Sequence, residues 1–324
     1  MTPLPKTRTR PLRRGIGALA VTLAAGGGAL ALAPAMAHAS VSPHATSYTF
    51  TTLNDQADPT FNQLLGINNK DVISGYFGSG MPGHPNKGYL LDPPYAPSNY
   101  INENFPGSAQ TQVTGLNNIG DSTGFWVNNA GTNRGFVEWN GVFTSYTDPA
   151  SPKTAGSVNQ LLGINNKGVA VGFYNDAKGH AHAYEVNQAT GVFTALKAPG
   201  VSVTATAINT NGFIVGFATK AGVTSSWLRT SSGQLTSFQF PGGSDTQAFG
   251  INIHGEIVGS YLDGAGVMHG FTLKNPLGPV SHWQSIDDPN GIGSTLINGI
   301  NDAGDLVGFY TDAAGNTDGM LATP

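Results

Sequence analysis

The feature that most constrains this chain is a three-residue phrase, Gly-Ile-Asn, that recurs at a nearly constant period. Six copies occur, two of them with one changed residue, and they end at the asparagines Asn68, Asn117, Asn165, Asn209, Asn252 and Asn301. Successive asparagines are 43 to 49 residues apart. That period fits a four-stranded propeller blade and is too long for a leucine-rich or ankyrin repeat.

Within each copy the residue pattern is that of short strands separated by turns. In the third copy, apolar runs over 160–164 and 169–174 flank Asn165-Asn166-Lys167-Gly168, a hairpin turn. Two further strands are expected over 182–186 and 192–196. The repeat therefore predicts an all-β fold built from four-stranded blades.

The two ends of the repeat array complement each other. Residues 47–54 match the fourth-strand phrase at 142–148, but no first three strands precede them. The sixth copy reaches Pro324 without a fourth strand. Propellers close their ring by pairing an N-terminal strand with the last blade, which leaves no sheet edge exposed. We therefore predict a single closed six-bladed β-propeller over residues 40–324, in preference to an open solenoid, which would need polar caps.

The first 39 residues have the composition of a signal peptide. A basic segment with Lys6, Arg8 and the pair Arg13-Arg14 precedes an apolar run over 15–33, and small residues follow at 37–40. We expect cleavage after Ala39, with Ala37 as the alternative. A transmembrane anchor is the competing interpretation, and both the general secretory and twin-arginine routes stay open. The prediction is a secreted, extracellular protein with no membrane span after cleavage.

Charge and cysteine content narrow the function classes. Without residues 1–39 the chain keeps ten basic and nineteen acidic residues, a net charge of −9. Binding to phosphates needs a basic face, so a nucleic-acid partner is excluded. Cysteine is absent, which excludes disulfides and a thiolate zinc site. The eight histidines are scattered along the chain, so we expect no metal, no cofactor, and a monomer stabilised by apolar burial.

The repeats resemble a family of bacterial extracellular repeats named for a His-Ala-Phe (HAF) triplet. The resemblance covers nearly all of residues 40–324. It rests on Gly-Ile-Asn-Asn followed by Gly-x-Ile-Val-Gly-x-Tyr, best seen over 163–174 and 299–310, and on triplets beginning at His182 and His269. It implies secretion and a propeller fold, and it implies no activity. The histidine is replaced in the other copies by Lys87, Arg134, Ser225 and Asp318.

Two sets of side chains recur at positions suited to ligand binding. Five residues before the anchor asparagine, four of the six copies have glutamine: Gln63, Gln112, Gln160 and Gln247. In the second strand, two residues after its glycine, five copies have an aromatic residue, among them Trp126, Tyr174, Tyr261 and Tyr310. We take these eight as candidate ligand-binding residues. The structural alternative is that the aromatic rings pack between blades and the glutamines hydrogen-bond to neighbours.

These observations predict an extracellular binding or scaffolding module for a polysaccharide or small molecule. We expect the ligand beside the glutamines, on the face of the variable loops, and not at the short Asn-Asn-x-Gly turns. One alternative is a structural repeat without a ligand. The other is a glycan-active hydrolase or lyase that uses loop carboxylates, of which the chain offers Asp58, Asp148, Asp245, Asp287 and Asp288.

Overall fold

The computed structural model describes residues 45–278 and 280–324, so the predicted signal peptide lies outside the described residues. The described part consists of 24 β-strands and one short 3-10 turn, η1 (Pro97–Asn99). No helix in it is long and apolar enough to cross a membrane.

The strands form antiparallel sheets that follow the sequence repeat. Four sheets have four strands each. The first two contain β2 (Asn62–Ile67), β3 (Ile73–Phe77), β4 (Lys87–Leu91) and β5 (Tyr100–Asn102), and β6 (Gln110–Leu116), β7 (Ser122–Val127), β8 (Asn133–Trp139) and β9 (Val142–Tyr146). The next two contain β10 (Asn159–Ile164), β11 (Val169–Asn175), β12 (Ala181–Asn187) and β13 (Val192–Ala195), and β14 (Ser202–Ile208), β15 (Ile214–Lys220), β16 (Val223–Arg229) and β17 (Leu235–Phe238). In each, the chain passes from one edge strand to the other in sequence order.

The remaining strands form one sheet of eight. It contains β18 (Ser244–Ile251), β19 (Ile257–Leu262), β20 (Met268–Lys274), β21 (His282–Ile286), β22 (Ser294–Ile300), β23 (Leu306–Thr311), β24 (Thr317–Thr323) and β1 (Thr49–Thr52). A single parallel residue pair, Met268 with Ser294, joins its two groups of four strands. Four-stranded blades in a propeller arrangement are thus confirmed, but this one bridge merges the sheets of the last two repeats, where the sequence predicted separate ones.

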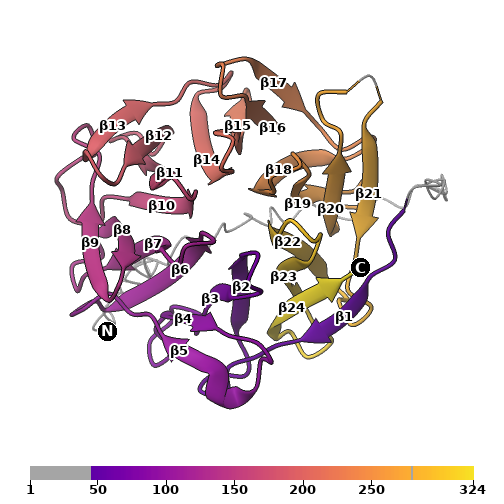
Figure 1. Ribbon diagram of the computed structural model, residues 1–324, viewed down its shortest axis with the longest axis horizontal. Helices are drawn as coiled ribbons and strands as arrows, with labels where there is room; N and C mark the ends of the chain where they lie inside the picture. The colour runs from indigo at the N-terminus through magenta and orange to yellow at the C-terminus, as the bar shows by residue number, and fades with distance from the viewer. Residues whose placement is uncertain (1–44, 279) are drawn as a thin grey trace, which may run out of the picture. The chain divides into compact units, whose positions relative to one another are not determined.

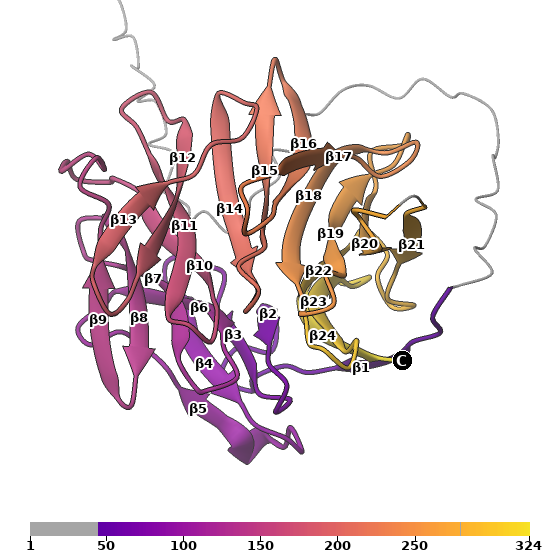
Figure 2. The ribbon, with the colours of Figure 1, turned by 45° about the horizontal axis from the view of Figure 1, so that its top comes forward.

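The N-terminal strand completes the last repeat. Strand β1 runs antiparallel to β24, with Thr49 opposite Thr323 and Thr52 opposite Met320. Figures 1 and 2 both show β1 beside β24. Leu53, just after β1, is 8% exposed and packs in a core cluster with Leu64 of the first repeat. The pairing predicted for residues 47–54 is therefore present.

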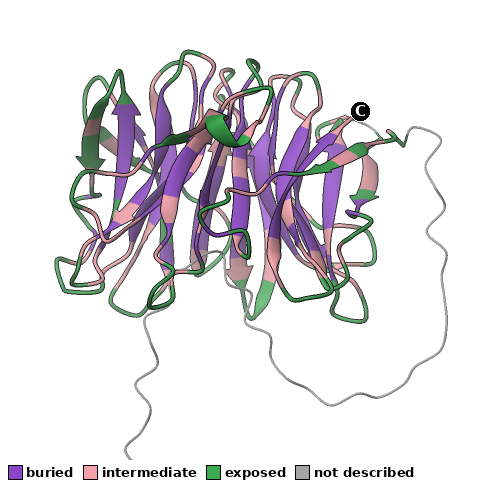
Figure 3. Cartoon of the chain, turned by 90° about the horizontal axis from the view of Figure 1, so that it is seen from below, coloured by how far each residue is buried: buried purple, intermediate pink, exposed green. Residues whose placement is uncertain are grey.

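The hydrophobic core lies between the sheets. One cluster joins Val171 and Ala183 of the third repeat to Ala205 and Trp227 of the fourth. The innermost strands β2, β6, β10, β14, β18 and β22 surround the centre in Figure 1. The outermost strands, such as β9 and β13, are mostly exposed or half-buried, as Figure 3 shows. Each repeat consequently shares part of its core with a neighbour.

The glycine of the repeated phrase lets the innermost strands approach one another. A Cβ atom added to Gly163 would lie 2.8 Å from the carbonyl oxygen of Thr206 and 2.9 Å from Cα of Ala207 in the next repeat. A Cβ on Gly299 would lie 3.0 Å from Cα of Gly66. These contacts are with backbone atoms, so a side chain would push neighbouring repeats apart. The close spacing of the inner strands explains why five of the six phrases begin with glycine.

Candidate binding cavity at the asparagine ring

The asparagine of each phrase serves two purposes, as Asn165 shows. Its Oδ1 accepts hydrogen bonds from the backbone N–H groups of Lys167 (3.0 Å) and Val169 (3.1 Å), which fixes the turn between β10 and β11. Its Nδ2 donates to the carbonyl oxygen of Asn209 in the next repeat, at 3.1 Å. One side chain therefore both shapes its own turn and links two repeats.

The links continue around the molecule and form what we call the asparagine ring. The Nδ2 groups of Asn68, Asn117, Asn165, Asn209 and Asn252 each donate to the carbonyl oxygen of the next anchor asparagine, at 2.9–3.2 Å. At the point where the chain closes, Asn301 instead donates to the carboxylate of Asp71, at 3.2 Å. All six anchor asparagines are 3–6% exposed. The sequence analysis interpreted these residues only as turn formers, although their recurrence was the signal.

The residues that follow the anchors form a neighbouring circle. The backbone N–H of Asn69 donates to Oδ1 of Asn118 (2.8 Å), and that of Asn118 to Oδ1 of Asn166 (2.8 Å). Asp302 accepts from the N–H of Ile253 (2.9 Å) and from Nδ2 of Asn69. The carboxylate of Asp302 therefore already accepts hydrogen bonds from two donors within the protein.

A cavity lies inside these two circles. Its walls are the anchor asparagines, the residues after them, and the residues before them, Ile67, Leu116, Ile164, Ile208, Ile251 and Ile300. Its volume open to the centres of water molecules is about 80 Å³, room for about five waters. None of the lining residues, all within the described part of the chain, is basic. The cavity is therefore small, neutral to acidic, and both apolar and polar.

Three lining side chains offer free hydrogen-bonding groups. In the described part of the chain, Nδ2 of Asn118, Nδ2 of Asn166 and the hydroxyl of Thr210 have no protein partner. Amide N–H groups donate, and a hydroxyl both donates and accepts. The cavity can thus bind a ligand that carries hydroxyl or carbonyl oxygens.

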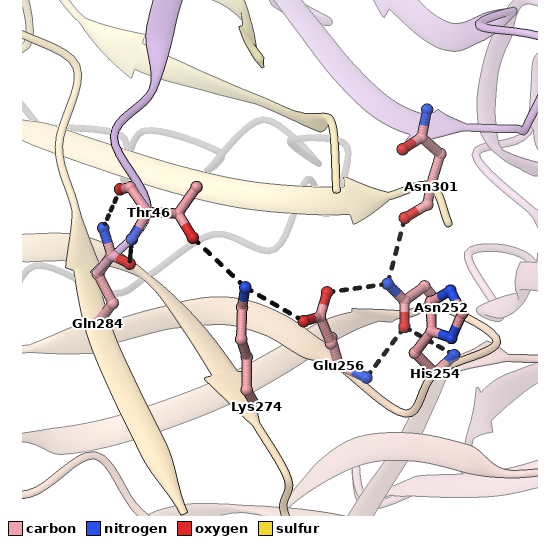
Figure 4. A network of polar contacts seen from close by, with 7 residues as sticks. All are labelled: Thr46, Asn252, His254, Glu256, Lys274, Gln284 and Asn301. Atoms are coloured by element: carbon pink, nitrogen blue, oxygen red, sulfur yellow. Dashed lines mark hydrogen bonds and ion pairs between the residues drawn. The ribbon is translucent and has the colours of Figure 1, made fainter. Parts of the chain in front are cut away.

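A chain of polar contacts ties the N-terminal segment to the ring (Figure 4). Gln284 bonds to both the N–H (2.8 Å) and the carbonyl (2.7 Å) of Thr46. Lys274 donates to Thr46 Oγ1 (3.3 Å) and pairs with Glu256 (3.3 Å). Glu256 in turn accepts from Nδ2 of Asn252, at 3.1 Å. The segment that leads into β1 is therefore linked to the cavity wall.

The four predicted glutamines are buried, at 2–7% exposure. Nε2 of Gln112 donates to Oδ1 of Asn86 (2.9 Å), and Nε2 of Gln160 to Oδ1 of Asn133 (3.2 Å), each in the preceding repeat. Gln63 accepts from the hydroxyl of Tyr76 (2.8 Å). Of the four, Gln247 alone has a buried Oε1 without a partner. Three of these side chains thus form hydrogen bonds within the protein, as the structural alternative predicted.

The four predicted aromatic side chains lie against other side chains. The Trp126 ring stacks on Phe105, with centroids 4.4 Å apart, and the guanidinium of Arg134 lies 5.9 Å from its centroid. Tyr261 stacks on Phe240 at 3.6 Å and on His269 at 5.3 Å. Tyr174 stacks on His182 at 5.1 Å, and Tyr310 shares a 2.8 Å hydrogen bond with Thr52. These aromatic side chains therefore join strands of one repeat, or one repeat to the next.

Sequence analysis did not anticipate the His–Asp pairs near the variable loops. Nδ1 of His84 lies 2.7 Å from Asp58, Nε2 of His182 lies 3.0 Å from Asp176, and Nδ1 of His269 lies 2.8 Å from Asp287. The hydrogen bond from His182 lowers the pKa of Asp176 to about 2. Across residues 45–278 and 280–324, no three His, Asp or Glu side chains converge to hold a metal ion.

The loop carboxylates considered for hydrolysis stabilise turns. Asp58 accepts from the N–H of Thr60 (3.3 Å), Asp148 from that of Ala150 (2.8 Å) and Asp288 from that of Asn290 (2.8 Å). Burial raises the pKa of Asp288. Asp245 has a positive φ of 45°, and Asp287 is the exposed partner of His269. Four of these five carboxylates therefore have partners within the protein.

No protein-family model matches this chain, and no curated protein is similar to it in sequence. Solved structures do resemble it. TolB from Acinetobacter baumannii aligns with a TM-score of 0.52 at 10% identity, over 77% of this chain and 63% of TolB. AofleA from Arthrobotrys oligospora aligns with a TM-score of 0.50 at 11% identity, over 86% of this chain and 88% of AofleA. A putative gluconolactonase aligns with a TM-score of 0.50 at 13% identity, over 86% of this chain and 93% of the gluconolactonase. At such identities the similarity shows the propeller-like fold alone.

Proposed function

We propose that this protein is a secreted binding module whose ligand enters the cavity at the asparagine ring. The observation that carries the proposal is the cavity itself, which combines free donors on Asn118 and Asn166 with an apolar wall of isoleucines. A concave site with a few convergent polar groups is where a rigid scaffold binds small ligands.

The ligand class follows from the chemistry of the wall. Sugars present hydroxyl groups at their edges and C–H groups on their faces, which suits amides beside isoleucines. The cavity has no basic residue to bind a free anion. Its small volume admits only the edge of a terminal sugar, so the rest of an oligosaccharide would extend into solvent. We therefore propose a neutral glycan end as the ligand.

Three further elements belong to the same proposal. The eight-stranded sheet acts as two blades, because only Met268 and Ser294 connect its halves, and the propeller then has six. The chain belongs with the HAF repeat proteins, on the strength of its repeated phrases. Its residues 1–39 are removed during export, which places the cavity outside the cell.

A binding screen tests the proposal. The secreted protein is titrated with neutral mono- and oligosaccharides by calorimetry, and two double variants follow. Asn118→Asp with Asn166→Asp keeps the acceptor oxygens of the circle and removes the free donors, so binding should weaken at least tenfold, about 1.4 kcal/mol. Gln160→Ala with Gln247→Ala should leave affinity unchanged. The opposite result would place the ligand beside the glutamines.

A further inference from the structure

The junction between the first and second repeats is chemically unlike the others at three buried positions. The first is Glu103, just after β5, whose N–H bonds to the carbonyl of Gly88 at 3.0 Å. The equivalent residues of the other repeats are all apolar or aromatic: Leu53, Tyr146, Leu196, Phe238 and Ile286. In this repeat a carboxyl group therefore occupies a position that the other repeats fill with an apolar or aromatic side chain.

The other two positions face each other across β7 and β8, where Ser122 lies opposite Glu138. In the other repeats the residues at the Ser122 position are Ile73, Ala170, Ile214, Ile257 and Leu306. Those at the Glu138 position are Leu91, Val186, Arg229, Leu273 and Ala322. Three polar side chains are thus gathered where nearly every other repeat is apolar.

The three side chains form one buried polar group. Glu103 and Glu138 are each 8% exposed, and Ser122 is fully buried. Ser122 Oγ donates to Oε1 of Glu103 at 2.7 Å, and the N–H of Gly141 donates to Oε1 of Glu138. Ser122 lies opposite Glu138 across β7 and β8, so the two buried carboxyl groups lie beside one serine side chain. Two neighbouring buried carboxyl groups disfavour double ionisation, so one of them holds a proton.

We propose that Glu103 and Glu138 form a proton-operated lock between the first and second repeats. The lock is closed while the pair shares a proton, and it loosens when the second carboxyl ionises, because two buried like charges then repel. This inference is independent of the ligand proposed above.

The surroundings offer little to relieve that repulsion. The charged residues on or beside the strands that pack around Glu103 are Lys87, Asp121, Arg134 and Glu138, together with Asp92 after β4. Lys87 pairs across the strands with Phe77, and Arg134 lies over Trp126. Asp121 bonds to Asn117. The tyrosines Tyr89 and Tyr100 have raised pKa values because of burial, so they remain neutral.

The sign of the pH effect follows from linkage. Burial, with the proximity of Glu138, raises the pKa of Glu103 from its ordinary 4.5 to about 7. The folded state then binds the proton more tightly than the unfolded state. The stabilisation is fully present below pH 4.5 and is lost as the pH rises through about 7.

Loosening of the lock would also weaken the part of the asparagine ring that crosses this junction. The ring bond from Asn68 to Asn117 and the bond from Asn69 to Asn118 cross the same junction. Asn117 also bonds to Asp121, the residue before Ser122. The cavity wall in the first two repeats would therefore respond to the same proton.

The test uses the scarcity of glutamate. The chain has four, Glu103, Glu138, Glu185 and Glu256, so the folded protein labelled with carbon-13 at glutamate carboxyls gives four signals. The Glu103 signal, assigned by its loss in Glu103→Gln, should show a titration near pH 7, and Glu138→Gln should move that titration to lower pH, while Glu185 and Glu256 serve as internal references. Carboxyls that all titrate below about pH 5.5 would overturn the proposal.

Thermal unfolding provides the second measurement. From pH 5 to pH 8 the melting temperature of the wild type should fall by about 5 °C more than that of Glu103→Gln with Glu138→Gln, whose pair cannot ionise. Glu185→Gln, on the equivalent strand of the third repeat, should retain the full decrease. An equal decrease in the double variant and the wild type would refute the lock.

Discussion

Removal of one ring asparagine should destabilise the protein by more than removal of a turn-forming asparagine of the same local geometry. Asn165→Ala deletes two bonds to turn N–H groups and the bond from Nδ2 to the carbonyl of Asn209. The carbonyl of Asn209 keeps its bond from the N–H of Gly212, so at about 1 kcal/mol for each of the three lost bonds the loss should be about 3 kcal/mol.

Asn128 supplies the matched control. Its Oδ1 accepts from the N–H groups of Ala130 (2.9 Å) and Thr132 (3.0 Å), which is the same turn geometry, but its side chain makes no bond to another repeat. Asn128→Ala should therefore cost only about 1–2 kcal/mol. Urea unfolding followed by tryptophan fluorescence measures both values. Equal losses would refute the claim that the ring bonds hold neighbouring repeats together.

Three further predictions follow from closure, packing and export. A chain that starts at Phe61 lacks β1 and the buried Leu53, so it should lose more than about 5 kcal/mol and its cooperative unfolding transition, whereas a chain that starts at Ser40 should melt sharply. Gly163→Ala should cost about 1–3 kcal/mol by denaturant unfolding, because its Cβ meets backbone of the next repeat, while Gly264→Ala, with open space around it, should cost much less. N-terminal sequencing of the secreted protein should begin at Ser40, and an intact membrane-bound chain would contradict this.

The blade pattern was predictable because its determinants are local. Asn165 and Gly168 specify a tight turn whatever surrounds them, and Gly168 has the positive φ of 67° that such a turn requires. The closing strand was predictable for a similar reason, since residues 47–54 repeat a fourth-strand phrase without the rest of its blade. Period and phase therefore sufficed to predict the four-stranded blades and the closing strand.

The contacts between repeats were not predictable in the same way. Whether Asn165 bonds to solvent or to Asn209 depends on how closely two inner strands approach, and that distance is set by Gly163 together with the whole ring. The same holds for His84 and Asp58, which are 26 residues apart in the chain. A comparison of the repeats position by position would have singled out Glu103, because its counterparts are apolar.

The location of the candidate site also depended on tertiary structure. Sequence reasoning placed the ligand beside the glutamines because variable loops surround that end of the propeller, and this remains a prediction. Burial of Gln112 and Gln160 against Asn86 and Asn133 is a property of the spacing between blades. The short turns at the other end, which vary little in sequence, enclose the cavity because six of them converge.

The most direct test of the central claim is a methyl NMR titration with the best neutral sugar from the screen. The cavity wall carries isoleucine methyl groups that report on its occupancy, from Ile67, Ile164, Ile208, Ile251 and Ile300. Ile101 and Ile292 are exposed residues outside the cavity lining and serve as references. The account predicts saturable shifts of the wall methyls with the references unchanged. Saturable binding that leaves every wall methyl unshifted would contradict it.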